Sequence, residues 1–77
     1  KIITGKTTMD EAQELLGNNG ISISVDADIA DQYRVCTGES VTYKTTVTVE
    51  DEQRQADYTL YGDEDGIVRF VKLMITD

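Results

Sequence analysis

The 77-residue chain contains no histidine, no proline and no tryptophan, and its single cysteine is Cys36. The usual general base is therefore missing, and one cysteine cannot form an intramolecular disulfide. We expect Cys36 to be a small buried hydrophobe, because no histidine is present to activate its thiol. The chain offers no cluster of metal ligands, and a domain this small has little room for a pocket. Enzymatic activity, a metal site and a cofactor are therefore not expected.

Long apolar runs are also absent. No segment approaches the roughly 18 apolar residues of a membrane span, and no signal peptide is recognisable. The chain begins at Lys1 rather than at a methionine, so removal of a leader stays open. We expect a cytoplasmic protein, of a host cell if a phage encodes it, with a periplasmic or secreted protein as the alternative.

Positive charge is scarce. Fifteen acidic and seven basic residues give a net charge of −8. Such a surface repels nucleic acid and anionic membranes, and it is attracted to basic protein surfaces. The alternative is that the charge serves solubility alone. The expected partner is a protein with a basic, nucleic-acid-binding surface, with no direct contact to nucleic acid or membrane.

The clearest helix signal runs from Thr8 to Leu16. Thr8 can cap the helix, Glu11 stands three residues later as a capping box requires, and Gly17 can end the helix. One apolar stripe at helical spacing comprises Met9, Ala12, Leu15 and Leu16. The pattern predicts a short helix with one buried face.

Alternating apolar and polar residues predict an antiparallel sheet. The expected strands are residues 21–25, 32–37, 41–49, 56–61 and 67–75, with a loop or single helical turn at 27–31 and turns at 38–40 and 62–66. Strand 67–75 is apolar on both faces, which suits a central strand or one that a partner covers, and which permits a homodimer. Residues 1–77 are expected to form a single α+β domain, with one short N-terminal helix packed on a four- to five-stranded antiparallel meander.

Two short segments resemble ligand-binding motifs but lack essential parts. Gly5-Lys6-Thr7-Thr8 matches the end of a Walker A loop, yet the required earlier glycine would lie before Lys1. Asp63-Glu64-Asp65-Gly66 is similar to part of a calcium loop, but strands rather than helices are expected to flank it. We therefore expect a helix cap and a hairpin turn.

The acidic residues gather in the predicted connections. In a five-stranded meander, alternate connections share one end of the sheet, so loop 26–31 should lie beside turn 50–52, opposite turns 38–40 and 62–66. Carboxylates spread along a rim can imitate the phosphates of nucleic acid and compete for a basic groove; the alternative is that they are only solvated loop residues. The candidate partner-binding residues are Asp26, Asp28, Asp31, Glu50, Asp51 and Glu52 at one end, and Glu39, Asp63, Glu64 and Asp65 at the other.

The segment TTMDEAQELLG, from Thr7 to Gly17, resembles the helix motif of the BamE and β-lactamase-inhibitor-protein family. The positions that match in type are Ile3, Gly5, Thr8, Leu16 and Gly17. Residues 58–68, with Asp65-Gly66, are similar to the family's ending of strand, Asp-Gly and strand. The resemblance implies helices packed on a small antiparallel sheet and a role in binding proteins. Lys6 and Ala12 depart from the pattern, and no lipobox cysteine is present, so it does not imply membrane anchoring.

Two functional hypotheses follow. The first is a small non-enzymatic inhibitor that occludes a basic nucleic-acid-binding surface, of the kind that phages encode against host defence, such as an anti-CRISPR or anti-restriction protein. The alternative is an envelope accessory domain of the BamE type, or a secreted inhibitor, that binds another protein through its sheet and loops.

Overall fold

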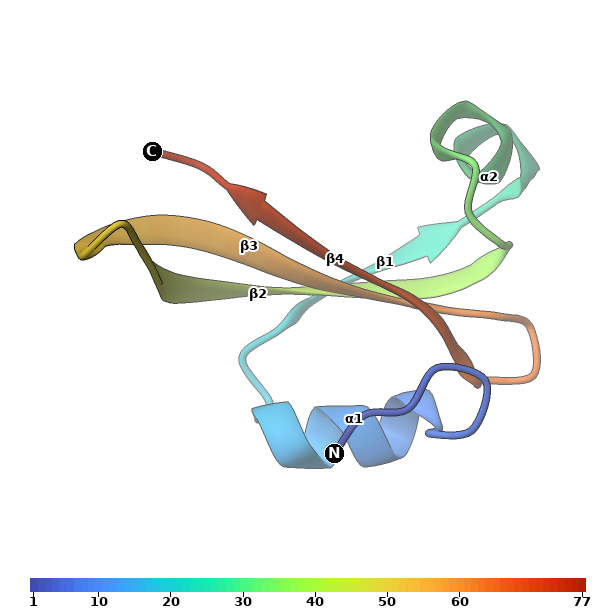
Figure 1. Ribbon diagram of the computed structural model, residues 1–77. Helices are drawn as coiled ribbons and strands as arrows, with labels where there is room; N and C mark the ends of the chain where they lie inside the picture. The colour runs from blue at the N-terminus through green and yellow to red at the C-terminus, as the bar shows by residue number, and fades with distance from the viewer.

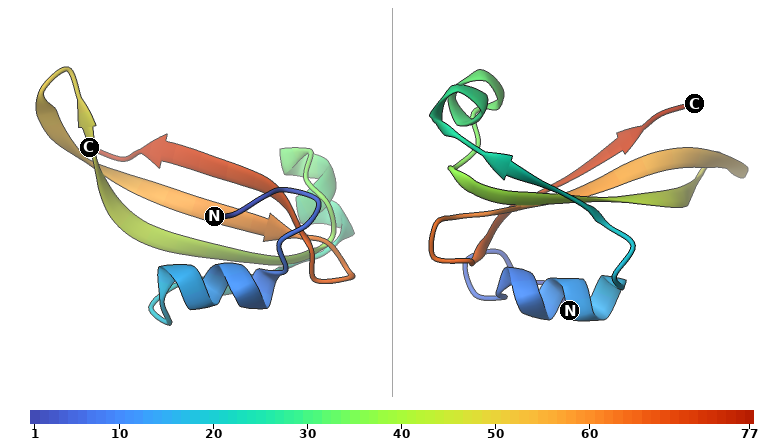
Figure 2. Two further views of the ribbon diagram at one scale, coloured as in Figure 1. Left: turned by 60° about the horizontal axis from the view of Figure 1, so that its bottom comes forward. Right: turned by 180° about the vertical axis from the view of Figure 1, so that it is seen from behind.

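The computed structural model describes residues 1–77, which form an α+β fold. Its elements are α1 (Met9–Leu16), β1 (Ile21–Val25), α2 (Ala27–Tyr33), β2 (Gly38–Val49), β3 (Glu52–Gly62) and β4 (Val68–Ile75). The strands form one antiparallel sheet in the order β1-β2-β3-β4. The two helices lie on opposite sides of this sheet, and α2 stands at the end where β1 passes to β2 (Figures 1 and 2). The predicted N-terminal helix on an antiparallel meander is confirmed.

Helix α1 begins at the predicted capping box. The Thr8 hydroxyl accepts a hydrogen bond from the Glu11 backbone N–H at 3.1 Å, and the Glu11 carboxylate accepts one from the Thr8 N–H at 3.1 Å. These two bonds satisfy backbone donors that a helix start otherwise leaves unpaired. Gly17 ends the helix with φ +104°, a conformation that favours glycine. Leu15, which was expected on the buried stripe, is 61% exposed.

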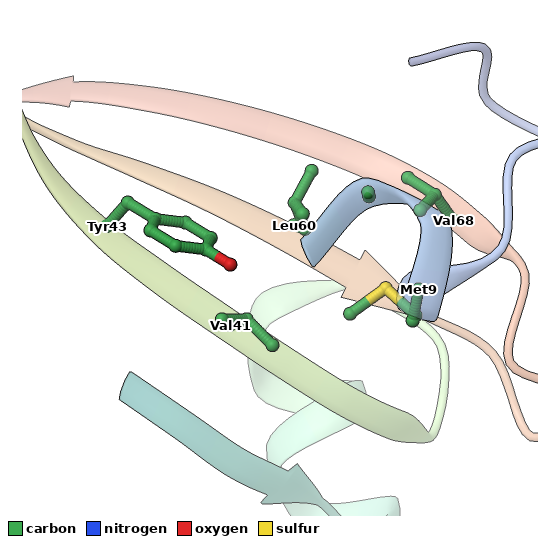
Figure 3. Packing of buried hydrophobic residues seen from close by; sticks show 6 residues of the cluster. Met9, Val41, Tyr43, Leu60 and Val68 are labelled. Carbon is green, nitrogen blue, oxygen red and sulfur yellow. The ribbon is translucent and has the colours of Figure 1, made fainter. Parts of the chain in front are cut away.

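The core lies between α1 and one face of the sheet. Six buried residues form it: Met9, Ala12, Val41, Tyr43, Leu60 and Val68 (Figure 3). Met9 packs over Gly62, where a Cβ atom would meet its side chain. Because α1 has eight residues, about 12 Å of helix, it cannot cover a sheet whose strands reach about 40 Å. Part of this face therefore stays open.

A bulge near the start of β4 changes which side chains reach the core. Tyr61 pairs with Phe70, but Gly62 pairs with Val68, so β4 carries one extra residue at this point. Val68 consequently turns into the core, while Phe70 turns to the opposite face. Simple alternation along 67–75 would place these two side chains on one face, and the bulge separates them.

Residues 32–37 do not form the predicted strand. The Asp26 carboxylate caps a second helix by accepting a hydrogen bond from the Ile29 N–H at 3.0 Å, and this helix continues to Tyr33. The following segment leads directly into β2, whose residues 38–40 pair with β1 instead of forming a turn. The sheet thus has four strands, and β4 lies at its edge rather than at its centre.

Candidate functional site

The strand count decides which acidic residues are neighbours. With four strands, the β1–β2 and β3–β4 connections share one end of the sheet, and the β2–β3 turn lies at the other (Figures 1 and 2). The predicted proximity of loop 26–31 and turn 50–52 is therefore wrong. The predicted proximity of Glu39 and residues 63–65 is confirmed, since both line one surface hollow together with Asp10.

We call the surface at the first of these ends the acidic end. It carries eight of the fifteen carboxylates: Asp10, Asp26, Asp28, Asp31, Glu39, Asp63, Glu64 and Asp65. Three basic residues, Lys6, Arg34 and Arg69, lie near them. Asp10 was not among the candidate residues, and its only signal in the sequence was its position in the first turn of the helix, which begins at this end.

Asp63 organises the β3–β4 turn. Its carboxylate accepts hydrogen bonds from the backbone N–H groups of Asp65, at 2.9 Å, and Ile67, at 3.0 Å. Its second oxygen accepts from the Arg69 Nε at 2.6 Å. The Arg69 guanidinium and the Ile67 N–H hold the pKa of Asp63 below its ordinary value. This carboxylate is thus engaged within its own chain.

These bonds predict an acid-sensitive contribution of Asp63 to stability. Because the pKa is lowered on folding, the contribution is complete above about pH 4, the unfolded value, and is lost as the pH falls through the folded value. Asp63→Asn should therefore unfold at a lower urea concentration than the native chain at pH 7. The difference between the two urea midpoints should shrink below pH 4. Asp65→Asn, whose side chain makes no hydrogen bond, is the control. A gap of equal size at pH 7 and about pH 2.5 would contradict the assignment.

The other carboxylates of the acidic end divide into engaged and free groups. Asp26 caps α2, Glu64 accepts from the Thr37 hydroxyl at 2.7 Å, and Glu39 accepts from the Gln13 amide at 3.4 Å. The side chains that form no hydrogen bond or ion pair within the chain are Asp10, Asp28, Asp31 and Asp65. All four residues are exposed. They are the carboxylates that can meet a partner without breaking an internal contact.

The opposite end of the sheet is the two-residue turn Glu50-Asp51, with φ values of +50° and +66°. This is the left-handed geometry of a type I′ hairpin. Glu52 lies 3.1 Å from Arg54, which also approaches Asp77 at 3.9 Å. The predicted candidate Glu52 is thus paired, whereas Glu50 and Asp51 are exposed in a separate, smaller acidic surface.

The Walker-like segment is bonded within the chain. Gly5 N–H donates to the Val68 carbonyl at 2.8 Å, the Lys6 and Thr7 N–H groups donate to the Ile3 carbonyl, and the Thr8 N–H donates to Glu11. The backbone donors that would cradle a phosphate are therefore all in use. The half-buried Cys36 thiol donates to the Gly62 carbonyl at 3.4 Å.

An apolar hollow of about 410 Å³ opens where α1 ends. It is lined mainly by Leu16, Tyr43, Val47, Tyr58 and Leu73. The Tyr43 hydroxyl donates to the Gly17 carbonyl at 2.9 Å, and burial, with the nearby Glu39 charge, raises its pKa. Lys44 is the one charged residue of the lining.

Comparisons with protein-family models, curated proteins and solved structures found no match. The resemblance of Thr8–Gly17 to the BamE family accordingly stays a prediction. None of the helices is of a length and apolarity that would span a membrane. No group of three or more histidine, cysteine, aspartate or glutamate side chains is placed to hold a metal ion.

Proposed function

We propose that this protein is a non-enzymatic inhibitor whose acidic end occupies the basic, nucleic-acid-binding surface of another protein, as phage anti-CRISPR and anti-restriction proteins do. The observation that carries the proposal is the gathering of eight carboxylates at one end, four of them free of internal contacts. The acidic net charge would steer the protein toward such a surface. The proposed compartment is the cytoplasm, where those targets act.

The breadth of the acidic end supports this proposal. The molecule measures 38 × 27 × 20 Å, and the acidic end extends from α2 on one side of the sheet to the start of α1 on the other (Figure 1). Carboxylates repeated along this end present successive negative charges, as the phosphates of a nucleic-acid strand do.

The test is a competition assay. A fluorescent DNA duplex is bound to each of a panel of purified guide-RNA nucleases and restriction enzymes, and the protein is titrated in. We expect displacement from at least one target, weakening at least tenfold between about 50 and 300 mM salt. Displacement that does not respond to salt, or none at a hundredfold excess over every target, would argue against charge mimicry.

Two charge-matched variants locate the surface. Asp31→Lys/Asp65→Lys changes two free carboxylates of the acidic end, and Glu50→Lys/Asp51→Lys changes the opposite turn. Each changes the net charge from −8 to −4. We expect the concentration needed to displace the DNA to rise at least about tenfold for the first variant and less than about threefold for the second. Close charge pairs contribute more to binding than distant ones. Equal losses would show that only net charge matters.

A further inference from the structure

Strand β4 has a neighbour on one side only, and its outer edge is open. Its large apolar side chains are between 40% and 52% exposed: Phe70, Val71, Leu73, Met74 and Ile75. Soluble proteins normally shorten, charge or cover such an edge, because its unpaired backbone groups can bind another strand. The other edge strand, β1, has five residues against eight in β4. The open edge of β4 is therefore available to an occupant.

We propose that the occupant is a second copy of this chain, paired antiparallel through β4 about a two-fold axis at Leu73. The two sheets then join into one sheet of eight strands. This inference does not depend on the proposed inhibitor function, since β4 and the acidic end are different surfaces.

The register follows from the backbone and from charge. Thr76 donates its N–H to Gln55 in β3, so by alternation the backbone groups of residues 71, 73 and 75 point outward. An axis at Lys72 would place two ammonium groups opposite each other, which is unfavourable. An axis at residue 71 would draw the bulge at residues 68–69 into the paired segment. An axis at Leu73 avoids the charge repulsion and leaves the bulge at the margin of the paired segment.

In this register the opposing side chains are complementary. Leu73 faces its own copy, Val71 faces Ile75, and Lys72 faces the apolar Met74 rather than another charge. Asp77 of one copy reaches the level of Arg69 of the other, but each is already held within its own chain, Arg69 by Asp63 and Asp77 by the Gln55 N–H, so the apolar side chains carry the complementarity. Covering these side chains completely in both copies would remove at most on the order of 1,000 Å² from water, which corresponds to a small, weak interface.

The net charge of −8 does not prevent this pairing. Residues 66–76 contain no acid and two bases, Arg69 and Lys72. The acidic end begins beyond Val68, five residues and roughly 17 Å from the axis, so the acidic ends of the two copies lie at least about 35 Å apart. That separation is several Debye lengths at physiological salt, where the length is about 8 Å.

Light scattering after gel filtration tests the dimer. We expect the mass to rise from 8.6 kDa towards twice that value between about 5 and 500 µM, the range in which a small, weak interface is expected to form. Leu73→Lys should stay monomeric throughout, and Leu15→Lys, at an exposed position on α1, should still dimerise. Circular dichroism checks that both variants fold. A native chain that stays monomeric at 500 µM, or a dimer that survives Leu73→Lys, would overturn the proposal.

Cysteine crosslinking tests the register, in a Cys36→Ser background. Directly opposed residues of a hydrogen-bonded pair lie about 5.5 Å apart at Cα, within the range of a disulfide. Under mild oxidation, Leu73→Cys should give a linked dimer, and Val71→Cys should give at least tenfold less. Val71→Cys/Ile75→Cys should restore the link. A stronger link from Val71→Cys than from Leu73→Cys would reject the axis at Leu73.

Discussion

Gly38→Ala should destabilise the domain by at least about 3 kcal/mol, because the new methyl group would strike backbone. Gly38 begins β2 with φ +144°, and a Cβ atom built there lies 2.8 Å from the Asp63 carbonyl carbon and closer still to the Gly62 oxygen. Neither atom can rotate away as a side chain would. The substitution must separate β2 from the β3–β4 turn, which also disturbs the acidic end.

Gly66→Ala is the matched control. Gly66 also has a positive φ, +78°, but a Cβ atom there meets nothing within 4 Å. Gly66→Ala should therefore lower the free energy of unfolding only by the cost of holding alanine at a positive φ, about 1 kcal/mol. Urea denaturation followed by circular dichroism measures both, with an expected difference of at least about 2 kcal/mol. If both variants lost the same free energy of unfolding, the close approach of backbone to Gly38 would not contribute to stability.

The capping box and the alternating strands were predictable, because each depends on residues within a few positions of one another. Thr8 and Glu11 form their reciprocal bonds within one helical turn, and strands 41–49 and 56–61 show their period directly. Gly38 was not predictable in the same way. Its close neighbour is Gly62, and a glycine needed for a distant backbone contact looks in the sequence like a glycine of a turn.

The second helix was missed because its pattern is ambiguous. Tyr33 and Val35 alternate as a strand would, and the capping role of Asp26 is visible only together with the helix that follows it. Assigning residues 32–37 to a strand placed turn 50–52 at the wrong end of the sheet. Each strand removed from a meander reverses the end at which every later connection lies. The candidate residues were thus identified from local composition, but their grouping required the correct strand count.

The position of β4 could not be deduced either. An apolar pattern on both faces indicates that both faces are covered, but it does not say whether the same chain or another one covers them. The sequence interpretation allowed a central strand or a partner, and the structure places β4 at the edge. This result leaves its exposed apolar residues to an interface and motivates the dimer proposed above.

Leu60→Ala should remove a large share of the stability of the domain, at a cost of about 3 kcal/mol, within the range for buried leucines. Leu60 is fully buried in the core, in β3 opposite Val41 and Val71. Only 12 of the 77 residues are buried, so little else compensates for the cavity. A domain of this length has roughly 4–12 kcal/mol in total.

Leu73→Ala is the control, since the same change at a side chain 52% exposed should cost below about 1 kcal/mol in dilute solution. Urea midpoints for both variants at about 5 µM should differ accordingly, and similar midpoints would contradict the assigned core. The two variants should also respond differently to protein concentration. If a second copy covers β4, the cost of Leu73→Ala grows between about 5 and 500 µM, because dimerisation stabilises the native chain by mass action. The cost of Leu60→Ala, whose side chain the monomer already buries, should change much less over that range.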